Sequence, residues 1–394
     1  MFYPRKLIEA LTRHIHKKEI VVLTGMRRTG KTTLYRMLFN SIKDSNKVFL
    51  DLENPIEQRI FEEKDYNNIW ASFSAYKISN KRKAYIFLDE IQSCPQAVKA
   101  VKYLYDHYNI KFFLTGSSSF YLKNLFPESL SGRKASFELF PLDYQEFLLF
   151  KNYKKEFRQD FREKERRKNH VVFEKEKKLF EQYLEFGGFP QVVLAETKED
   201  KNNHLNDIFK SYFEKDVRGL ADFKDIRAVR ELILLLLQRT GSKLDITKIA
   251  SETGVSRETI YSYLSFLQGT YFIDLITPFT ANRDREVSGA KKVYVCDNGF
   301  LTMFAKISSG QLLENLVFQN LKKYGKLHYY QRRTGGEIDF IIPDSKTAFE
   351  VKETGTPADY KKLSSLNRDL NLKQGYVITK NYHPDKGFIP ASDI

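Results

Sequence analysis

The residues with the clearest chemical meaning form a short glycine-bearing segment near the start of the chain. Positions 25–32 read GMRRTGKT, which has the spacing G-x-x-x-x-G-K-[ST], and they stand between an apolar run and a helical pattern. Gly25 and Gly30 permit a tight loop whose backbone N–H groups converge on phosphate oxygens, and the positive end of the following helix faces the same anion. The cation of Lys31 suits the β- and γ-phosphates, and the hydroxyl of Thr32 suits Mg²⁺. We therefore expect a site for ATP with Mg²⁺.

An acidic pair further along the chain completes this expected site. Asp89 ends the apolar run AYIFLD, so its carboxylate would emerge at a sheet edge near the loop and hold Mg²⁺. Glu90 follows it and is the candidate base or water-orienting residue for hydrolysis of the γ-phosphate. The loop together with a later strand that ends in Asp-Glu predicts an ATPase. The residues that we expect to bind the nucleotide and its magnesium are Gly25, Arg28, Thr29, Gly30, Lys31, Thr32, Thr33, Asp89 and Ser117, with Thr32 and Asp89 as the metal ligands.

Two further segments carry groups that could act on the γ-phosphate. The run IKFFLTGSSS places Thr115 and Ser117 at the end of a strand, where a hydroxyl contacts the γ-phosphate or the attacking water, or else caps the next turn. Arg133 precedes another apolar run and is either an arginine finger for a neighbouring subunit, which needs a homo-oligomer, or a surface arginine. The expected catalytic residues are Lys31, Glu90 and Arg133.

A second candidate site lies in the last part of the chain. Glu314 is on an amphipathic helix, Asp339 lies in EIDFII, and Glu350 and Lys352 lie in FEVK, on one face of a strand because side chains alternate. The set resembles the PD-(D/E)xK nuclease constellation. In that chemistry Glu314, Asp339 and Glu350 bind one or two Mg²⁺ that activate water, and Lys352 stabilises the developing charge. The pattern leaves open a working nuclease or an inactive module that binds nucleic acid or protein.

The elements that must position these residues follow from the hydrophobic pattern. Over 1–150, near-continuous apolar runs at 19–25, 47–53, 84–90 and 110–116 alternate with helix-length amphipathic segments. Runs that are apolar on both faces indicate strands of a parallel sheet with helices on both sides. The expected fold is therefore an α/β doubly wound sheet, and the motif at 25–32 makes it one of the P-loop NTPase type.

The remaining chain changes character several times. We expect an ATPase core at 1–150, a charged connector at 151–178, a helical lid at 179–238, a winged-helix-like segment at 239–290 and a last α/β domain at 291–394. The connector is either solvated or a phosphate-contacting surface. The helix-turn-helix pattern, in which Ser256 caps the second helix, either binds DNA or packs against protein.

Length and composition limit the number of domains and the classes of partner and site that the chain can have. A chain of 394 residues predicts two to four domains. Lys and Arg number 65 against 50 Asp and Glu, and this formal charge of +15 favours a polyanionic partner, DNA first. Two cysteines exclude a disulfide framework and a zinc cluster. No apolar signal core or membrane-length run is present, so we expect a cytoplasmic protein.

These stretches together resemble a family of prokaryotic and archaeal AAA-type P-loop ATPases that carry a C-terminal domain of unknown function. The matching segments are LTGMRRTGKTT, YIFLDEIQ, FLTGSSS, SLSGR with ELFPLDYQEFL, EFGGFPQVVL, YFEKDVRG and ENLVFQNL with EIDFII and FEVK. The resemblance implies an ATPase core, a helical lid, a winged helix and a terminal restriction-endonuclease-like α/β domain, but no particular substrate. We therefore expect an ATP-hydrolysing enzyme that acts on or with DNA. The alternatives are an ATP-gated, Mg²⁺-dependent nuclease and a nucleotide-dependent protein scaffold without nucleic acid.

Overall fold

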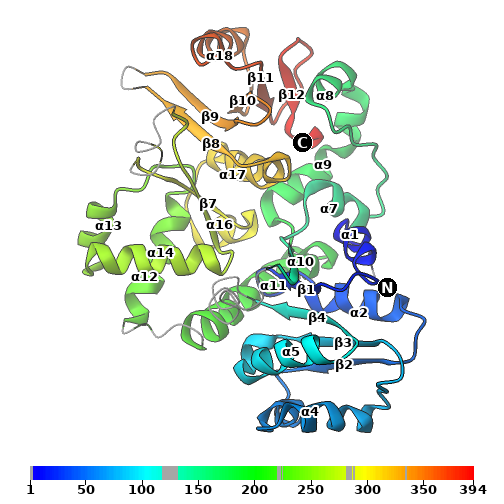
Figure 1. The fold of residues 1–394 in the computed structure, drawn as a ribbon. Helices are drawn as coiled ribbons and strands as arrows, with labels where there is room; N and C mark the ends of the chain where they lie inside the picture. Colours follow the sequence, from blue (N-terminus) through cyan, green and yellow to red (C-terminus); the bar gives the residue numbers. More distant parts are fainter. Residues whose placement is uncertain are drawn as a thin grey trace. The chain divides into compact units, whose positions relative to one another are not determined.

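The computed structural model describes residues 3–117, 132–219, 223, 225–280, 286, 289–332 and 335–394. The chain forms two compact units, whose helices and strands are drawn in Figure 1. Unit 1 consists of Met1–Phe140 together with Gly269–Tyr271, and unit 2 consists of Pro141–Gln268 and Phe272–Ile394. Each unit has a five-stranded sheet of its own.

A parallel sheet forms the centre of unit 1. Its strands are β1 (Ile20–Thr24), β2 (Lys47–Asp51), β3 (Ala84–Asp89), β4 (Ile110–Gly116) and β5 (Lys134–Glu138). Their order is β2-β3-β4-β1-β5, and every neighbouring pair is parallel. β1, β3 and β4 are buried along their whole length, which explains their continuous apolar sequences. The predicted α/β class is confirmed, and the ends of β1 and β3 come to the same edge of the sheet.

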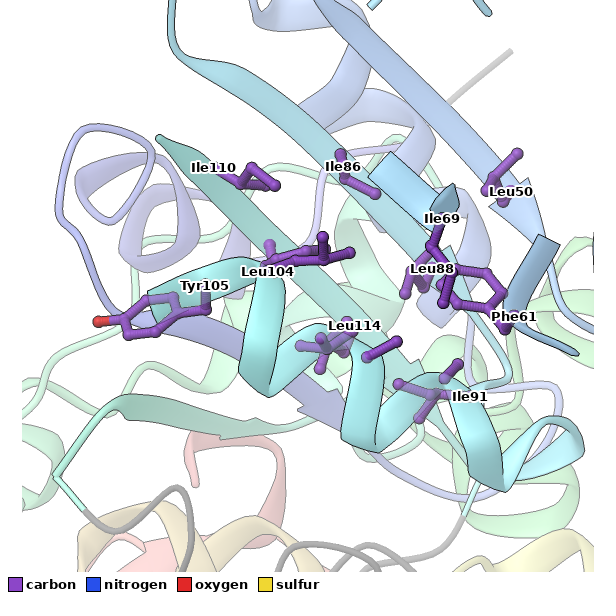
Figure 2. Packing of buried hydrophobic residues seen from close by; sticks show 14 of the residues in the cluster. Leu50, Phe61, Ile69, Ile86, Leu88, Ile91, Leu104, Tyr105, Ile110 and Leu114 are labelled. Atoms are coloured by element: carbon purple, nitrogen blue, oxygen red, sulfur yellow. The ribbon is translucent and has the colours of Figure 1, made fainter. Parts of the chain in front are cut away.

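Helices cover both faces of this sheet. Because strand side chains alternate, Val21 packs into one layer and its neighbour Val22 into the other. Figure 2 shows the layer that contains Val22, called the second layer below, in which Leu104 packs with Ile86 and Leu114 of the strands. Burying one such side chain contributes about 1.5–3 kcal/mol to the free energy of folding. The first layer contains α1 (Leu7–Arg13) and α2 (Lys31–Ser41); the second contains η1 (Arg59–Glu62), α4 (Tyr66–Ser72), η2 (Phe73–Tyr76), η3 (Ile91–Ser93) and α5 (Pro95–His107). The short α3 (Pro55–Gln58), which has no buried residue, leads into η1.

The first half of unit 2 is helical. The Gly187-Gly188 break is a turn in which the Gly188 N–H donates to the Asp297 carboxylate at 2.7 Å, and a side chain at Gly187 would overlap that carboxylate. The helices are α7 (Tyr144–Phe150), α8 (Phe161–Arg167), α9 (His170–Phe186), α10 (Pro190–Leu194), α11 (Lys198–Ser211), η5 (Tyr212–Arg218) and α12 (Ile226–Gln238).

The charged segment 151–178 includes α8 and the first half of α9, and it contacts the end of the chain. The Lys155 ammonium donates to the Ser392 carbonyl at 2.8 Å and pairs with the buried carboxylate of Glu176 at 2.5 Å. The Lys168 ammonium donates to the Phe388 carbonyl at 3.0 Å. The segment is therefore packed against the C-terminal strands of unit 2.

A helix-turn-helix arrangement and two strands follow. α13 (Ile246–Thr253) ends at Gly254, whose φ of +70° suits glycine, and α14 (Arg257–Gly269) begins after Ser256. The Ser256 hydroxyl accepts from the Thr259 N–H at 3.2 Å, which is the predicted cap. The strands β6 (Ile273–Ile276) and β7 (Lys292–Val295) pair antiparallel, and α16 (Asn298–Phe304) comes next. DNA binding through these elements stays a prediction.

The last part of unit 2 contains the expected C-terminal α/β sheet. Its order is β12-β11-β10-β9-β8, with antiparallel pairing between β8, β9 and β10 and parallel pairing between β10, β11 and β12. Among the described residues, no helix is both long and apolar enough to cross a bilayer. The predicted domain boundaries within this unit stay predictions. The elements are α17 (Ser309–Leu321), η6 (Lys322–Tyr324), β8 (His328–Gln331), β9 (Glu337–Ile342), β10 (Thr347–Lys352), α18 (Pro357–Asp369), β11 (Gln374–Thr379), β12 (Phe388–Pro390) and η7 (Ala391–Asp393).

Candidate functional site

The glycine-bearing loop joins β1 to α2, as the motif requires. Gly25 has a φ of +150°, and a Cβ there would lie 2.1 Å from the carbonyl oxygen of Leu139. Gly30 has a φ of +98° and stands at the N-terminus of α2, where it has no side chain to cover the first N–H groups of the helix. Backbone geometry therefore explains both glycines, and a helix N-terminus of this kind favours a negative charge beside it.

A residue outside the sequence motif supports the loop. The Arg5 guanidinium is buried and donates to the carbonyls of Thr29 and Phe140, both at 2.8 Å. The Thr29 hydroxyl donates to the Met26 carbonyl at 2.8 Å. These bonds join the loop to the segment after β5. An arginine before the first helix gives no local sequence signal for this role.

Lys31 is folded onto the loop. Its ammonium donates to the carbonyls of Gly25 at 2.8 Å and Met26 at 3.1 Å, and the residue is only 4 % exposed. The ammonium of Lys31 therefore lies against the backbone of the loop, and its three N–H groups are donors of the kind that phosphate oxygens accept from.

The structure brings Thr32 and Asp89 together. The Thr32 hydroxyl donates to Asp89 Oδ2 at 2.7 Å, and the Thr115 hydroxyl donates to Asp89 Oδ1. Burial raises the pKa of Asp89, and the hydrogen bonds from Thr115 and Thr32 partly oppose that rise. Two hard oxygen donors therefore stand beside the loop, which is the ligand type that Mg²⁺ prefers.

Glu90 belongs to a short polar chain at the ends of β3 and β4. Its backbone N–H donates to the Thr115 hydroxyl at 2.9 Å, and its carboxylate accepts from the Gln92 amide. The same amide donates to the Ser117 hydroxyl at 3.1 Å. Gln92 is buried and was not predicted as a site residue, although YIFLDEIQ contains it. Ser118 and Ser119 of the same run lie outside the described residues.

Arg133 lies away from the loop of its own chain. It directly precedes β5, at the amino end of the strand, whereas the loop and Asp89 follow the carboxyl ends of β1 and β3. Its guanidinium pairs with Asp106 at 2.8 Å and is 41 % exposed. An action on phosphate by Arg133 is therefore open only towards a neighbouring copy. Residues 129–131 before it lie outside the described residues.

A tyrosine from far along the sequence joins unit 1. Tyr271 follows α14, and its hydroxyl lies 2.6 Å from the Thr24 hydroxyl and donates to Glu138 Oε1 at 3.0 Å. Thr24 is the last residue of β1 and directly precedes Gly25. Tyr271 has a φ of +63°, an unusual value for a bulky residue. No local pattern predicts this contact.

The second predicted site lies within unit 2, where a lysine joins its carboxylates. The Lys292 ammonium lies 2.8 Å from Glu337, 3.5 Å from Glu314 and 3.8 Å from Asp339, and its side chain is 5 % exposed. Tyr294 donates to Glu314 at 2.6 Å. The sequence predicted neither Lys292 nor Glu337 as part of this cluster.

Glu350 and Lys352 form a pair of their own at 2.8 Å. Burial raises the pKa of Glu314 and of Glu350 to about 7 each. Burial opposes the charge of Lys292, but the neighbouring carboxylates outweigh burial and raise its pKa. The described part of the chain contains no group of three or more His, Cys, Asp or Glu side chains placed to hold a metal ion. The nuclease magnesium site therefore gains no support from this geometry, because an ammonium stands among the carboxylates.

Comparison with known proteins identifies a family for the first part of the chain. Residues 17–148 match the family described as an AAA domain. The chain is 30 % identical over 388 residues to an uncharacterized protein of Methanocaldococcus jannaschii, covering 94 % of this chain and 83 % of that protein. This chain belongs to that family of AAA-type ATPases. A second uncharacterized relative of the ATPase, from Haemophilus influenzae, is 28 % identical over 387 residues, covering 92 % and 90 % of the two chains.

The rest of the ATPase matches families without an assigned role. Residues 177–311 and 309–391 match two domains of unknown function, DUF8612 and DUF4143. Among solved structures, the Aeropyrum pernix ORC1 protein in complex with DNA has a TM-score of 0.35 at 12 % identity, covering 80 % of this chain and 93 % of that one. PCH-2 of C. elegans has a TM-score of 0.32 at 16 % identity, covering 53 % and 65 %. Similarities this weak carry no argument about function.

Proposed function

We propose that this AAA-type ATPase binds ATP with Mg²⁺ at residues 25–32 and hydrolyses it. The observation that carries the proposal is the 2.7 Å contact between Thr32 and Asp89, which are 57 positions apart in the sequence. It stands beside a loop with two glycines in positive-φ conformations and a helix N-terminus. Bound magnesium supplies charge neutralisation for the β- and γ-phosphates.

The side chains divide the work. Lys31 exchanges the carbonyls of Gly25 and Met26 for phosphate oxygens, and the loop with the first turn of α2, including Arg28, Thr29 and Thr33, supplies backbone N–H donors. Asp89 and Thr32 supply the metal ligands.

Glu90 accepts a proton from, or orients, the attacking water. The Gln92 amide holds the Glu90 carboxylate and also donates to the Ser117 hydroxyl. Thr115 is a positioning residue, because its hydroxyl bonds both Asp89 and the Glu90 N–H. Arg133 serves the nucleotide of a neighbouring copy, which makes the working form a homo-oligomer.

Two variants and a control test this proposal. Lys31→Ala should lose binding of a fluorescent ATP analogue, whereas Glu90→Gln should retain binding and lose turnover by roughly 100-fold or more. Lys64→Ala, at an exposed lysine of the same unit, should behave as wild type. Unchanged ATP affinity in Lys31→Ala would show that the loop is not the nucleotide site.

We further propose that the ATPase acts on or with DNA. The formal charge of +15 and the exposed Tyr261 on α14, 60 % accessible, support this choice over a scaffold without nucleic acid. Turnover should rise when duplex DNA is added. DNA affinity should fall as salt rises, and a flat salt response would favour the scaffold.

A further inference from the structure

A basic groove lies within unit 2, between α8, α18 and the start of β11. It has a volume of about 790 Å³. The two helices come from distant parts of the sequence, and both contact β12 or the residue before it. Glu165 of α8 accepts from the Gly387 N–H, and the Tyr360 ring of α18 packs on Phe388. Both helices are labelled in Figure 1. The cations that line the groove are Arg162, Arg166, Lys361, Arg368 and Lys373.

These five cations are exposed and unneutralised. None of them forms an ion pair with a carboxylate among the residues that the structure describes, although Arg162 bonds the Tyr376 hydroxyl. Glu165 is the single carboxylate lining the groove within the described ranges, and it is engaged by the Gly387 N–H. Asp369, next to Arg368, is paired with Arg332 at 2.8 Å. The groove therefore has a local excess of positive charge that an anionic partner would offset.

The aromatic side chains indicate which polyanion fits. Tyr376 is 4 % exposed and packs on Phe349, and the Tyr360 ring packs on Phe388. Single-stranded nucleic acid is held by exposed rings on which bases stack, and the rings lining this groove are turned into the core. Lysine and arginine without stacking platforms suit the regularly spaced phosphates of a duplex.

We propose that this groove binds the phosphate backbone of duplex DNA without reading its sequence. The inference rests on the DNA part of the proposed function and names the surface that carries it. α8 comes from the charged segment 151–178, so that segment contributes a phosphate-contacting face as well as packing against the C-terminal strands.

The test measures duplex binding without nucleotide. Fluorescence anisotropy of a labelled duplex of about 25 base pairs is followed over a salt series for the full chain. Arg166→Ala/Arg368→Ala/Lys373→Ala should bind at least ~10-fold more weakly at 0.1 M salt and reduce the slope of log K against log salt by roughly two to three. Binding should not depend on the duplex sequence.

The matched control removes three exposed lysines of unit 1, in Lys64→Ala/Lys81→Ala/Lys99→Ala, and should leave the slope within about one of wild type. If the groove variant binds like this control while wild type shows a steep salt response, the groove assignment is wrong and the DNA function stands. If wild type binds no duplex at low salt, the groove assignment and the DNA function are both wrong. ATP hydrolysis is judged separately by Lys31→Ala. Should the triple variant unfold, Lys361→Glu against Lys361→Arg, at an exposed position, gives the same comparison.

Discussion

The hydroxyl of Thr32 donates to the carboxylate of Asp89 at 2.7 Å, which joins the start of α2 to the end of β3. Asp89→Asn keeps the shape but removes the charge, so Mg²⁺-dependent ATP turnover should fall roughly 100-fold or more. Burial raises the pKa of Asp89, which means that the fold disfavours the charged form, so the melting temperature of the variant should not fall.

The matched control for this variant is Asp51→Asn. Asp51 ends β2 and pairs in register with Asp89, but it is exposed. Its turnover should equal that of wild type. A fully active Asp89→Asn enzyme, or equal losses in the two variants, would contradict the assignment of the metal ligand.

Gly25→Ala should destabilise the protein and abolish ATP binding. The added Cβ would lie 2.1 Å from the Leu139 carbonyl oxygen at a φ of +150°, so the loop and the segment that follows β5 would have to separate. Gly254→Ala is the control, because its φ is +70° but, among the described residues, no packing neighbour from another segment lies within 4 Å of the new Cβ. Denaturant unfolding should give a loss of about 1 kcal/mol for Gly254→Ala and a larger loss for Gly25→Ala. Equal losses would show that the Leu139 contact is unimportant.

The sequence predicts the parts of the site whose causes are local. The loop motif requires a strand before it and a helix after it, and parallel strands bring their carboxyl ends to one edge, so the meeting of Thr32 with Asp89 follows from pattern alone. The α/β class follows from continuous apolar runs for the same reason.

The parts that sequence reasoning missed depend on contacts between distant segments. Arg5 bonds the Phe140 carbonyl 135 positions away, and Tyr271 meets Thr24 across 247 positions. Lys292 enters the acidic cluster from the strand β7, outside the motif that suggested the cluster. A single sequence carries no periodic signal for such pairs, because each depends on how whole elements pack.

Tyr271→Phe should weaken ATP binding a few-fold. The variant removes the hydroxyl that contacts Thr24 at 2.6 Å and Glu138 at 3.0 Å, so the residue preceding Gly25 loses a support. Unfolding should cost about 1–2 kcal/mol less free energy than in wild type. Tyr261→Phe, at a position 60 % exposed, should change neither quantity. Identical ATP affinities in all three proteins would remove Tyr271 from the site.

Lys111→Met should stabilise the protein at neutral pH. Lys111 is fully buried on β4, and burial lowers its pKa to about 8. Below pH 8 Lys111 is charged in both the folded and the unfolded chain, so wild type bears the full cost of burying the charge. Between pH 8 and about 10.4 only the unfolded chain keeps the charge, so the stability of wild type rises with pH. The advantage of the variant, on the order of 2 kcal/mol at pH 7, should therefore shrink as pH rises.

Melting temperatures over pH 7–10 check this trend, and Lys102→Met, at an exposed lysine of α5, should show no such trend relative to wild type. The lost hydrogen bond to the Glu19 carbonyl reduces the gain by about 1 kcal/mol. An advantage that grows with pH would contradict the direction of the pKa shift.

Lys292→Met should unfold more easily and should then respond to divalent cations. The ammonium contacts Glu337, Glu314 and Asp339 from a side chain that is 5 % exposed. Its loss leaves the largely buried carboxylates of Glu314 and Asp339 unneutralised, at a cost of roughly 3–5 kcal/mol. In nucleotide-free protein, Mn²⁺ or Mg²⁺ should raise the melting temperature of this variant. A metal ion can then take the place of the ammonium, because carboxylate oxygens are the ligands that these ions prefer. The double variant Lys292→Met/Asp339→Asn should lose that response.

Wild type should show no comparable response, since its own lysine already occupies the position among the carboxylates. Lys243→Met, an exposed lysine close to the same strand, should melt like wild type. For the same reason, plasmid nicking by wild type in Mg²⁺ or Mn²⁺ should not exceed that of Asp339→Ala. Suppose instead that Mn²⁺ stabilises wild type but does not stabilise Asp339→Asn. The carboxylates would then bind metal in the presence of Lys292, and this result would support the nuclease alternative.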